Sequence, residues 1–108
     1  MKVEILYFSD CPNHTLAVES VREVLRQEAV PADIVEVEVK DTATAQEVGF
    51  LGSPTILVDG KDVETGVRAG GAFGMICRTY IDSGQRTGIP PVEWIRAAVR
   101  EAKGKSHK

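Results

Sequence analysis

The stretch that decides the fold is Lys2–His14, which reads KVEILYFSDCPNH. Its first half holds four consecutive apolar residues, Ile5–Phe8, as expected for a strand covered on both faces. A polar pair ends the strand, and Pro12 suits the first helical position, where the N–H that proline lacks would be unpaired anyway. Thr15–Glu28 then carries apolar side chains at helical spacing. The stretch therefore predicts a strand that runs into an amphipathic helix, with Cys11 at the joint.

The next segment predicts a second strand and a second helix. Ile34–Val39 alternates valine and glutamate, which predicts a strand with one dry face and one wet, acidic face at the edge of a sheet. Asp41 or Thr42 can cap a short helix that ends near Val48. The glutamates of the strand, Glu36 among them, are expected to face solvent.

The second half of the chain predicts a hairpin and a last helix. Ser53–Val58 reads as a third strand, and the Asp-Gly pair that follows it is a strong signal for a hairpin into residues 61–64. Residues 65–89 are rich in glycine and less regular, although Met75–Ile81 has the composition of a strand or a buried turn. Two prolines at positions 90 and 91 open a final helix with one apolar side.

Size and charge limit the classes of function. The 108 residues, 43% of them hydrophobic, suffice for a single domain over residues 1–108 with an ordinary core. A net charge of −3 argues against a nucleic-acid footprint, and no apolar run approaches the length of about 18 residues that a membrane span needs. The basic residues 103–108 are expected to form a frayed, disordered tail. The first strand begins next to Met1, which leaves no room for a secretory signal and predicts a reducing, cytoplasmic setting.

The predicted order of elements is β-α-β-α-β-β-α. Strands that are separated by helices favour parallel pairing with right-handed crossovers, and the hairpin adds an antiparallel strand. The sequence therefore predicts an α/β fold in which a mixed four-stranded sheet carries helices on both faces.

This order, with Cys11-Pro12 opening the first helix and Ser53-Pro54-Thr55 opening the third strand, resembles the thioredoxin-like superfamily and its small glutaredoxin-like members. The residues around both motifs are also similar to those of small bacterial thioredoxin-family proteins, some of which are labelled alkylmercury lyase. The resemblance implies a thioredoxin-like sandwich and a cis Ser53–Pro54 peptide bond facing Cys11. It also implies thiol–disulfide exchange with protein or small-molecule thiols and disulfides, without a cofactor. Pro12, Ser53, Pro54 and Thr55 would line the substrate site.

Three residues are the candidates for the chemistry of exchange. Cys11 is the expected nucleophile, because the start of a helix favours a thiolate over a thiol. Dithiol members of the superfamily have a second cysteine where His14 stands, so a dithiol cycle within this motif is excluded. His14 would stabilise the thiolate as a cation or act as an acid, the alternative being a histidine that only faces solvent. Cys77 would resolve a mixed disulfide on Cys11, unless it is a core residue and an external thiol does so.

Two other classes of function stay open. One is capture of a soft metal such as mercury by Cys11 together with Cys77 or His14. No resident metal site is predicted, because a tetrahedral zinc site on Cys11 and His14 would need two more ligands, and only Cys77 and His107 remain. The other class is an interaction domain whose cysteines do no redox work. Neither nucleic acid nor a membrane is an expected partner.

Overall fold

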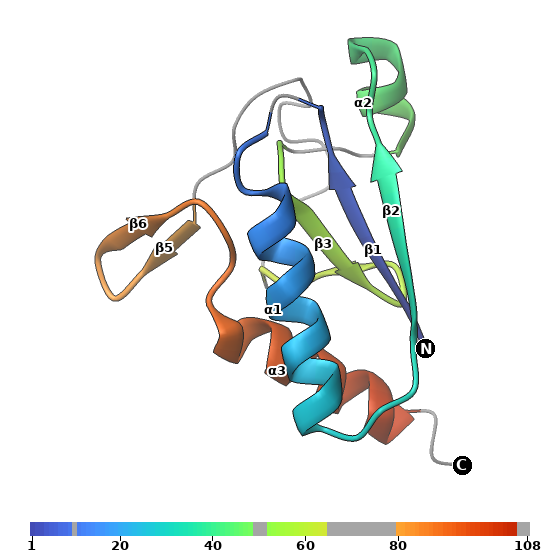
Figure 1. Ribbon diagram of the computed structural model, residues 1–108, viewed down its shortest axis with the longest axis vertical. Coiled ribbons are helices and arrows are strands. Elements are labelled where there is room, and N and C mark those ends of the chain that lie inside the picture. Colours follow the sequence, from blue (N-terminus) through green and yellow to red (C-terminus); the bar gives the residue numbers. More distant parts are fainter. Residues whose placement is uncertain (10, 49–51, 65–79, 106–108) are drawn as a thin grey trace.

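The protein folds as a four-stranded sheet with helices packed against it, in a computed structural model that describes residues 1–9, 11–48, 52–64 and 80–105 (Figure 1). The elements are β1 (Lys2–Tyr7), α1 (His14–Gln27), β2 (Asp33–Glu38), α2 (Thr42–Val48), β3 (Thr55–Val58), β4 (Lys61–Asp62), β5 (Tyr80–Asp82), β6 (Gln85–Thr87) and α3 (Val92–Lys105). The predicted α/β class and its mixed four-stranded sheet with helices are confirmed.

The strand order in the main sheet is β2-β1-β3-β4. β2 lies at the edge, as its alternating pattern predicted, and pairs in parallel with β1. β3 runs antiparallel to β1, which differs from the parallel pairing predicted for strands separated by a helix. The reason is the length of α2, because its seven residues rise about 1.5 Å each, whereas the six residues of β2 rise about 3.3 Å each. α2 therefore does not carry the chain back along β2, and β3 starts at the end of the sheet where β2 stops.

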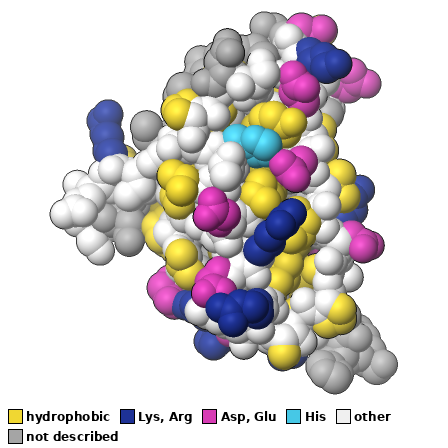
Figure 2. Space-filling model, viewed as in Figure 1, with side chains coloured by type: hydrophobic (Ala, Val, Ile, Leu, Met, Phe, Trp, Pro, Cys, Tyr) yellow, Lys and Arg dark blue, Asp and Glu magenta, His cyan; other side chains and the backbone are white. Residues whose placement is uncertain are grey.

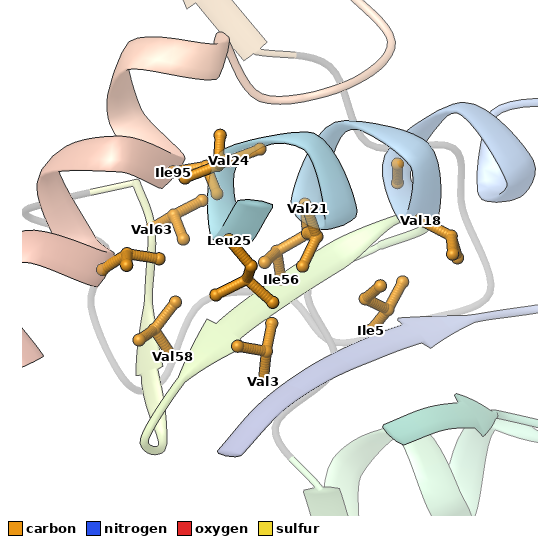
Figure 3. Close-up of a cluster of buried hydrophobic side chains, with 12 residues drawn as sticks. Val3, Ile5, Val18, Val21, Val24, Leu25, Ile56, Val58, Val63 and Ile95 are labelled. Carbon is orange, nitrogen blue, oxygen red and sulfur yellow. The ribbon is translucent and has the colours of Figure 1, made fainter. Parts of the chain in front are cut away.

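Alternation along β1 explains why its apolar run is continuous. Ile5 faces α1 and α3, whereas Leu6 faces the side of the sheet on which α2 packs. The larger core lies between the sheet and the pair α1 and α3 (Figure 3). Its buried residues are Val3, Ile5, Ala17, Val18, Val21, Val24, Leu25, Ile56, Val58, Val63, Ile95 and Val99. The smaller core on the opposite face is built on Leu6, Val39 and Ala45.

The start of α1 differs from its prediction. The first helical residue is His14 and Asn13 is the N-cap, so Pro12 lies before the helix rather than at its first position. The Cys11 N–H donates to the Phe8 carbonyl at 3.0 Å and closes a turn against the end of β1. Because Cys11 is held in that turn, the first helical hydrogen bond forms later, from the Ala17 N–H to the Asn13 carbonyl.

The C-terminal third of the chain contains a second, two-stranded sheet. β5 and β6 form an antiparallel hairpin whose turn, Ser83-Gly84, has positive φ at both residues. Of the segment predicted as a strand or a buried turn, only its last two residues are described, and they belong to β5; residues 75–79 lie outside the described part. Residues 103–105, which begin the predicted tail, are the last residues of α3, and Lys103 Nζ donates to the Glu28 carbonyl at 3.3 Å.

Candidate functional site

Cys11 sits between the carboxyl end of β1 and the first turn of α1. The residue is buried, with 8% of its surface exposed, and its thiol is free. The side chain of Asn13 makes no capping hydrogen bond, and the first turn of α1 holds no acidic residue. The positive end of the helix is therefore not offset by a carboxylate from its own first turn, and it lies two residues beyond Cys11. Pro12, predicted as a substrate contact, is exposed next to it.

Phe8 joins this turn to the segment that begins β3. Its carbonyl accepts from the Cys11 N–H, and its own N–H donates to the Ser53 hydroxyl oxygen at 3.4 Å. The register agrees, because Leu6 pairs with Thr55. The Ser53–Pro54 peptide bond is cis, which confirms that prediction. Both predicted halves of the site therefore lie at the same end of β1.

The Ser53–Thr55 segment is buried and bonded within the protein. Ser53 and Thr55 are 0% and 1% exposed, and the Thr55 hydroxyl donates to the Gly52 carbonyl at 2.6 Å. The Pro54 carbonyl accepts a hydrogen bond of 2.5 Å from the buried Tyr80 hydroxyl. The sequence analysis missed Tyr80, since no local pattern predicts a bond between residues 26 positions apart. The role of this segment in binding a substrate stays a prediction.

His14 is held by the sheet rather than by Cys11. Its ring stacks on Tyr7 with the ring centroids 3.6 Å apart and the planes 4° from parallel. Its Nε2 lies 2.6 Å from Oε1 of Glu36 in β2. Within the described residues there is no hydrogen bond between Cys11 and His14. Figure 2 shows the histidine ring reaching the surface of this face, next to an acidic side chain.

Register explains why Glu36 meets His14. Ile5 pairs with Glu36 and Tyr7 pairs with Glu38, so Glu36 emerges on the face of the sheet that α1 covers. The sequence pattern placed the glutamates of this strand on its wet face, and Glu36 is indeed 40% exposed at its side chain. The pattern alone could not find the contact, which depends on where the first turn of α1 lies over β1 and β2.

Cys77 lies outside the described residues, so its two predicted roles, resolving thiol or core residue, both stay predictions. Among the residues that the structure does describe, no group of three or more histidine, cysteine, aspartate or glutamate side chains is placed to hold a metal ion. Capture of a soft metal by Cys11 together with Cys77 or His14 stays a prediction.

The wider comparisons identify no relative. No protein-family model, no curated protein and no solved structure matches this chain. No helix in the described ranges is both long and apolar enough to cross a membrane. The function must therefore be inferred from the arrangement around Cys11.

Proposed function

We propose that this chain is a thioredoxin-like protein that carries out thiol–disulfide exchange, with Cys11 as the nucleophile. The observation that carries the proposal is the place of Cys11, in a turn that ends β1 and precedes the positive end of α1. A partial positive charge at a helix N-terminus favours the thiolate, and the thiolate is the species that attacks a disulfide. The Ser53–Thr55 segment next to the same turn supports the proposal, because it is where the resemblance expects substrate to bind.

The exchange reaction needs no cofactor. The sulfur of Cys11 attacks one sulfur of a protein or small-molecule disulfide, the substrate S–S bond breaks, and the other substrate sulfur leaves as a thiolate that takes up a proton. The product is a mixed disulfide on Cys11. If Cys77 resolves the mixed disulfide, its thiolate attacks the Cys11 sulfur, the substrate leaves as a thiolate, and the Cys11–Cys77 disulfide that forms is then reduced by external thiols of a reducing cytoplasm. If an external thiol resolves it, that thiolate attacks the substrate sulfur, forms a new disulfide with it and returns Cys11 to the free thiol.

Intact-protein mass spectrometry with oxidised glutathione as the probe tests the first step. In the Cys77→Ala variant, we expect one glutathione adduct per chain, formed on Cys11 and faster than on an unstructured cysteine peptide at the same pH. The matched control is Cys11→Ala, which keeps Cys77 and should form the adduct more slowly.

Two results would count against the proposal. One is adduct formation on Cys11 no faster than on the unstructured peptide, which would leave the helix N-terminus without chemical effect. The other is a Cys11→Ala variant that reacts as fast as Cys77→Ala, which would move the reactive thiol to Cys77. With both cysteines present, mild oxidation to an intramolecular disulfide would identify Cys77 as the resolving thiol, whereas adducts alone would assign that role to an external thiol.

A further inference from the structure

Tyr7, His14 and Glu36 form a cluster that has no role in the exchange reaction described above, and two contacts fix the orientation of its histidine ring. The His14 ring is fixed in plane by the stack on Tyr7 and fixed in rotation by the 2.6 Å contact between Nε2 and the Glu36 carboxylate. The two side chains of the pair are 23% and 40% exposed, so the contact is shielded in part from water. We propose that Glu36 is a positioning residue that holds His14 as the proton acceptor for the Cys11 thiol, an inference that rests on the proposed function.

The carboxylate selects one tautomer of the ring. An ionised carboxylate can only accept hydrogen bonds, so the ring nitrogen that faces Glu36 must carry a proton. In a neutral imidazole only one nitrogen is protonated, and the other keeps its lone pair. With the proton on Nε2, Nδ1 of His14 is the basic nitrogen. The described part of the chain gives Nδ1 no hydrogen-bond partner.

Three elements of the described chain pack around the His14 ring. Glu36 faces it from β2, Tyr7 faces it from β1, and Glu38 is paired in register with Tyr7. α1 contributes its positive N-terminal end and no acidic side chain in its first turn. Glu36 is thus the one carboxylate in direct contact with His14 among the described residues, and it faces Nε2 only.

Both reacting residues are attached to the same end of β1. The ring of Tyr7 holds His14, and the carbonyl of the next residue, Phe8, accepts from the N–H of Cys11. Hydrogen bonds between catalytic groups are often long or poorly aligned without substrate and tighten in the complex. In the proposed step the Cys11 proton passes to His14 Nδ1, and the sulfur attacks the disulfide. The substrate S–S bond then breaks, and the departing sulfur takes the proton from Nδ1, so atoms and charge balance.

Four proteins in a Cys77→Ala background test the role of Glu36: the parent, Glu36→Gln, Glu36→Asp and the control Glu38→Gln. Glu38→Gln removes the same charge from the same strand. Exchange is followed with an aromatic disulfide, 5,5′-dithiobis(2-nitrobenzoic acid), across a pH series, and ring ¹⁵N spectra report the tautomer of His14. We expect Glu36→Gln to slow exchange at neutral pH by about tenfold. The difference should close above about pH 9, where thiols ionise without a base.

The remaining readouts separate positioning from a structural role. The parent and Glu38→Gln should show the Nε2-protonated tautomer and equal exchange rates, Glu36→Gln should show a mixture, and Glu36→Asp should recover most of the rate because it keeps a carboxylate. Normal exchange in the parent with no slowing in Glu36→Gln overturns this inference alone. A parent that exchanges no faster than an unstructured cysteine peptide overturns the proposed function, and the role of Glu36 with it, whatever the tautomer.

Discussion

The hydroxyl of Tyr80 donates a hydrogen bond of 2.5 Å to the carbonyl of Pro54, across 26 positions of sequence. Both side chains are among the most deeply buried in the described residues. The ring of Tyr80 also meets Trp94 of α3 edge to face, with centroids 6.1 Å apart. This bond ties the β5–β6 hairpin and α3 to the segment that begins β3, and so to the wall of the candidate site next to Cys11.

Tyr80→Phe should lower the free energy of unfolding by about 1–2 kcal/mol, because it removes the hydroxyl from a buried carbonyl without changing the ring. Urea unfolding measures the change. Tyr7→Phe is the matched control, since Tyr7 uses its ring to stack on His14 and should lose less than about 0.5 kcal/mol. Equal losses in the two variants would show that the Tyr80–Pro54 bond does not stabilise the fold.

Ala29→Gly should raise stability by about 0.5–1 kcal/mol, because Ala29 has a φ of 52°, a left-handed conformation that favours glycine. The position ends α1 in a Schellman motif, in which the N–H groups of Ala29 and Val30 donate to the carbonyls of Arg26 and Leu25. Thermal or urea unfolding checks the expected gain.

The control for that change is the same substitution inside a helix. Ala97 is exposed in the middle of α3, where glycine costs about 0.5–1 kcal/mol relative to alanine. Ala29→Gly and Ala97→Gly should therefore shift stability in opposite directions. A loss in both would mean that the left-handed conformation at residue 29 carries little strain.

Local patterns in the sequence were sufficient for most of the fold. The apolar run before Cys11 predicted β1, and the spacing of apolar residues predicted the buried face of α1, including Val21 and Val24. The Asp59-Gly60 pair predicted the β3–β4 hairpin, and its two residues have the positive φ that this turn requires. Asp41 was one of two candidate caps for α2, and its carboxylate accepts from the Thr44 N–H at 2.7 Å. Each of these features depends on neighbours in sequence.

The features that the sequence analysis missed depend on contacts between residues that are far apart in the sequence. The bond between Tyr80 and Pro54 and the contact between His14 and Glu36 join elements whose relative placement no local pattern specifies. The β5–β6 hairpin was missed for a different reason, because its strands are three residues each, too short for an alternation to stand out. The direction of β3 follows from the short length of α2. The sequence pattern predicted a short helix there, but the expectation of parallel pairing for strands separated by a helix did not take that length into account.

Gly88→Ala should lower stability by about 0.5–1.5 kcal/mol, because a Cβ at this position would lie 2.3 Å from Nδ2 of Asn13 and would force that side chain, which makes no capping hydrogen bond, out of its rotamer. The clash would push on the N-cap of α1, two residues from Cys11. In an Asn13→Ala background the same substitution should cost little, and a double-mutant cycle measures the coupling. Gly104→Ala is the control, since open space surrounds that position in α3 and alanine favours a helix. An undiminished cost without the Asn13 side chain would contradict the contact.

The last prediction concerns acid stability and the carboxylate at the end of α1. Two nitrogens of Arg100 donate to the Glu28 carboxylate at 2.9 and 3.1 Å, and Nε of Arg96 lies 3.7 Å from Oε2 of Glu28. The hydrogen bond from Arg100, reinforced by the charges of Arg100, Lys103 and Arg96, holds the pKa of Glu28 below its ordinary value of 4.5. The pair therefore joins the C-terminal end of α1 to α3 most strongly when Glu28 is ionised.

Glu28→Gln should be less stable than the parent at neutral pH, and the difference should shrink on acidification. Below the ordinary pKa of 4.5, Glu28 becomes protonated in the unfolded chain while it stays ionised in the folded chain. The stability that the ionised Glu28 contributes to the parent is therefore lost as the pH falls through its lowered pKa in the folded protein. Asp41, whose pKa is lowered by the backbone N–H of Thr44, is unchanged in both proteins and cancels in the difference. Urea unfolding between about pH 7 and pH 3 measures the two curves of stability against pH.

Arg100→Gln should flatten the curve of stability against pH in the same way, because it removes the largest cause of the lowered pKa of Glu28. A Glu28→Gln curve that stays parallel to that of the parent would contradict the assignment.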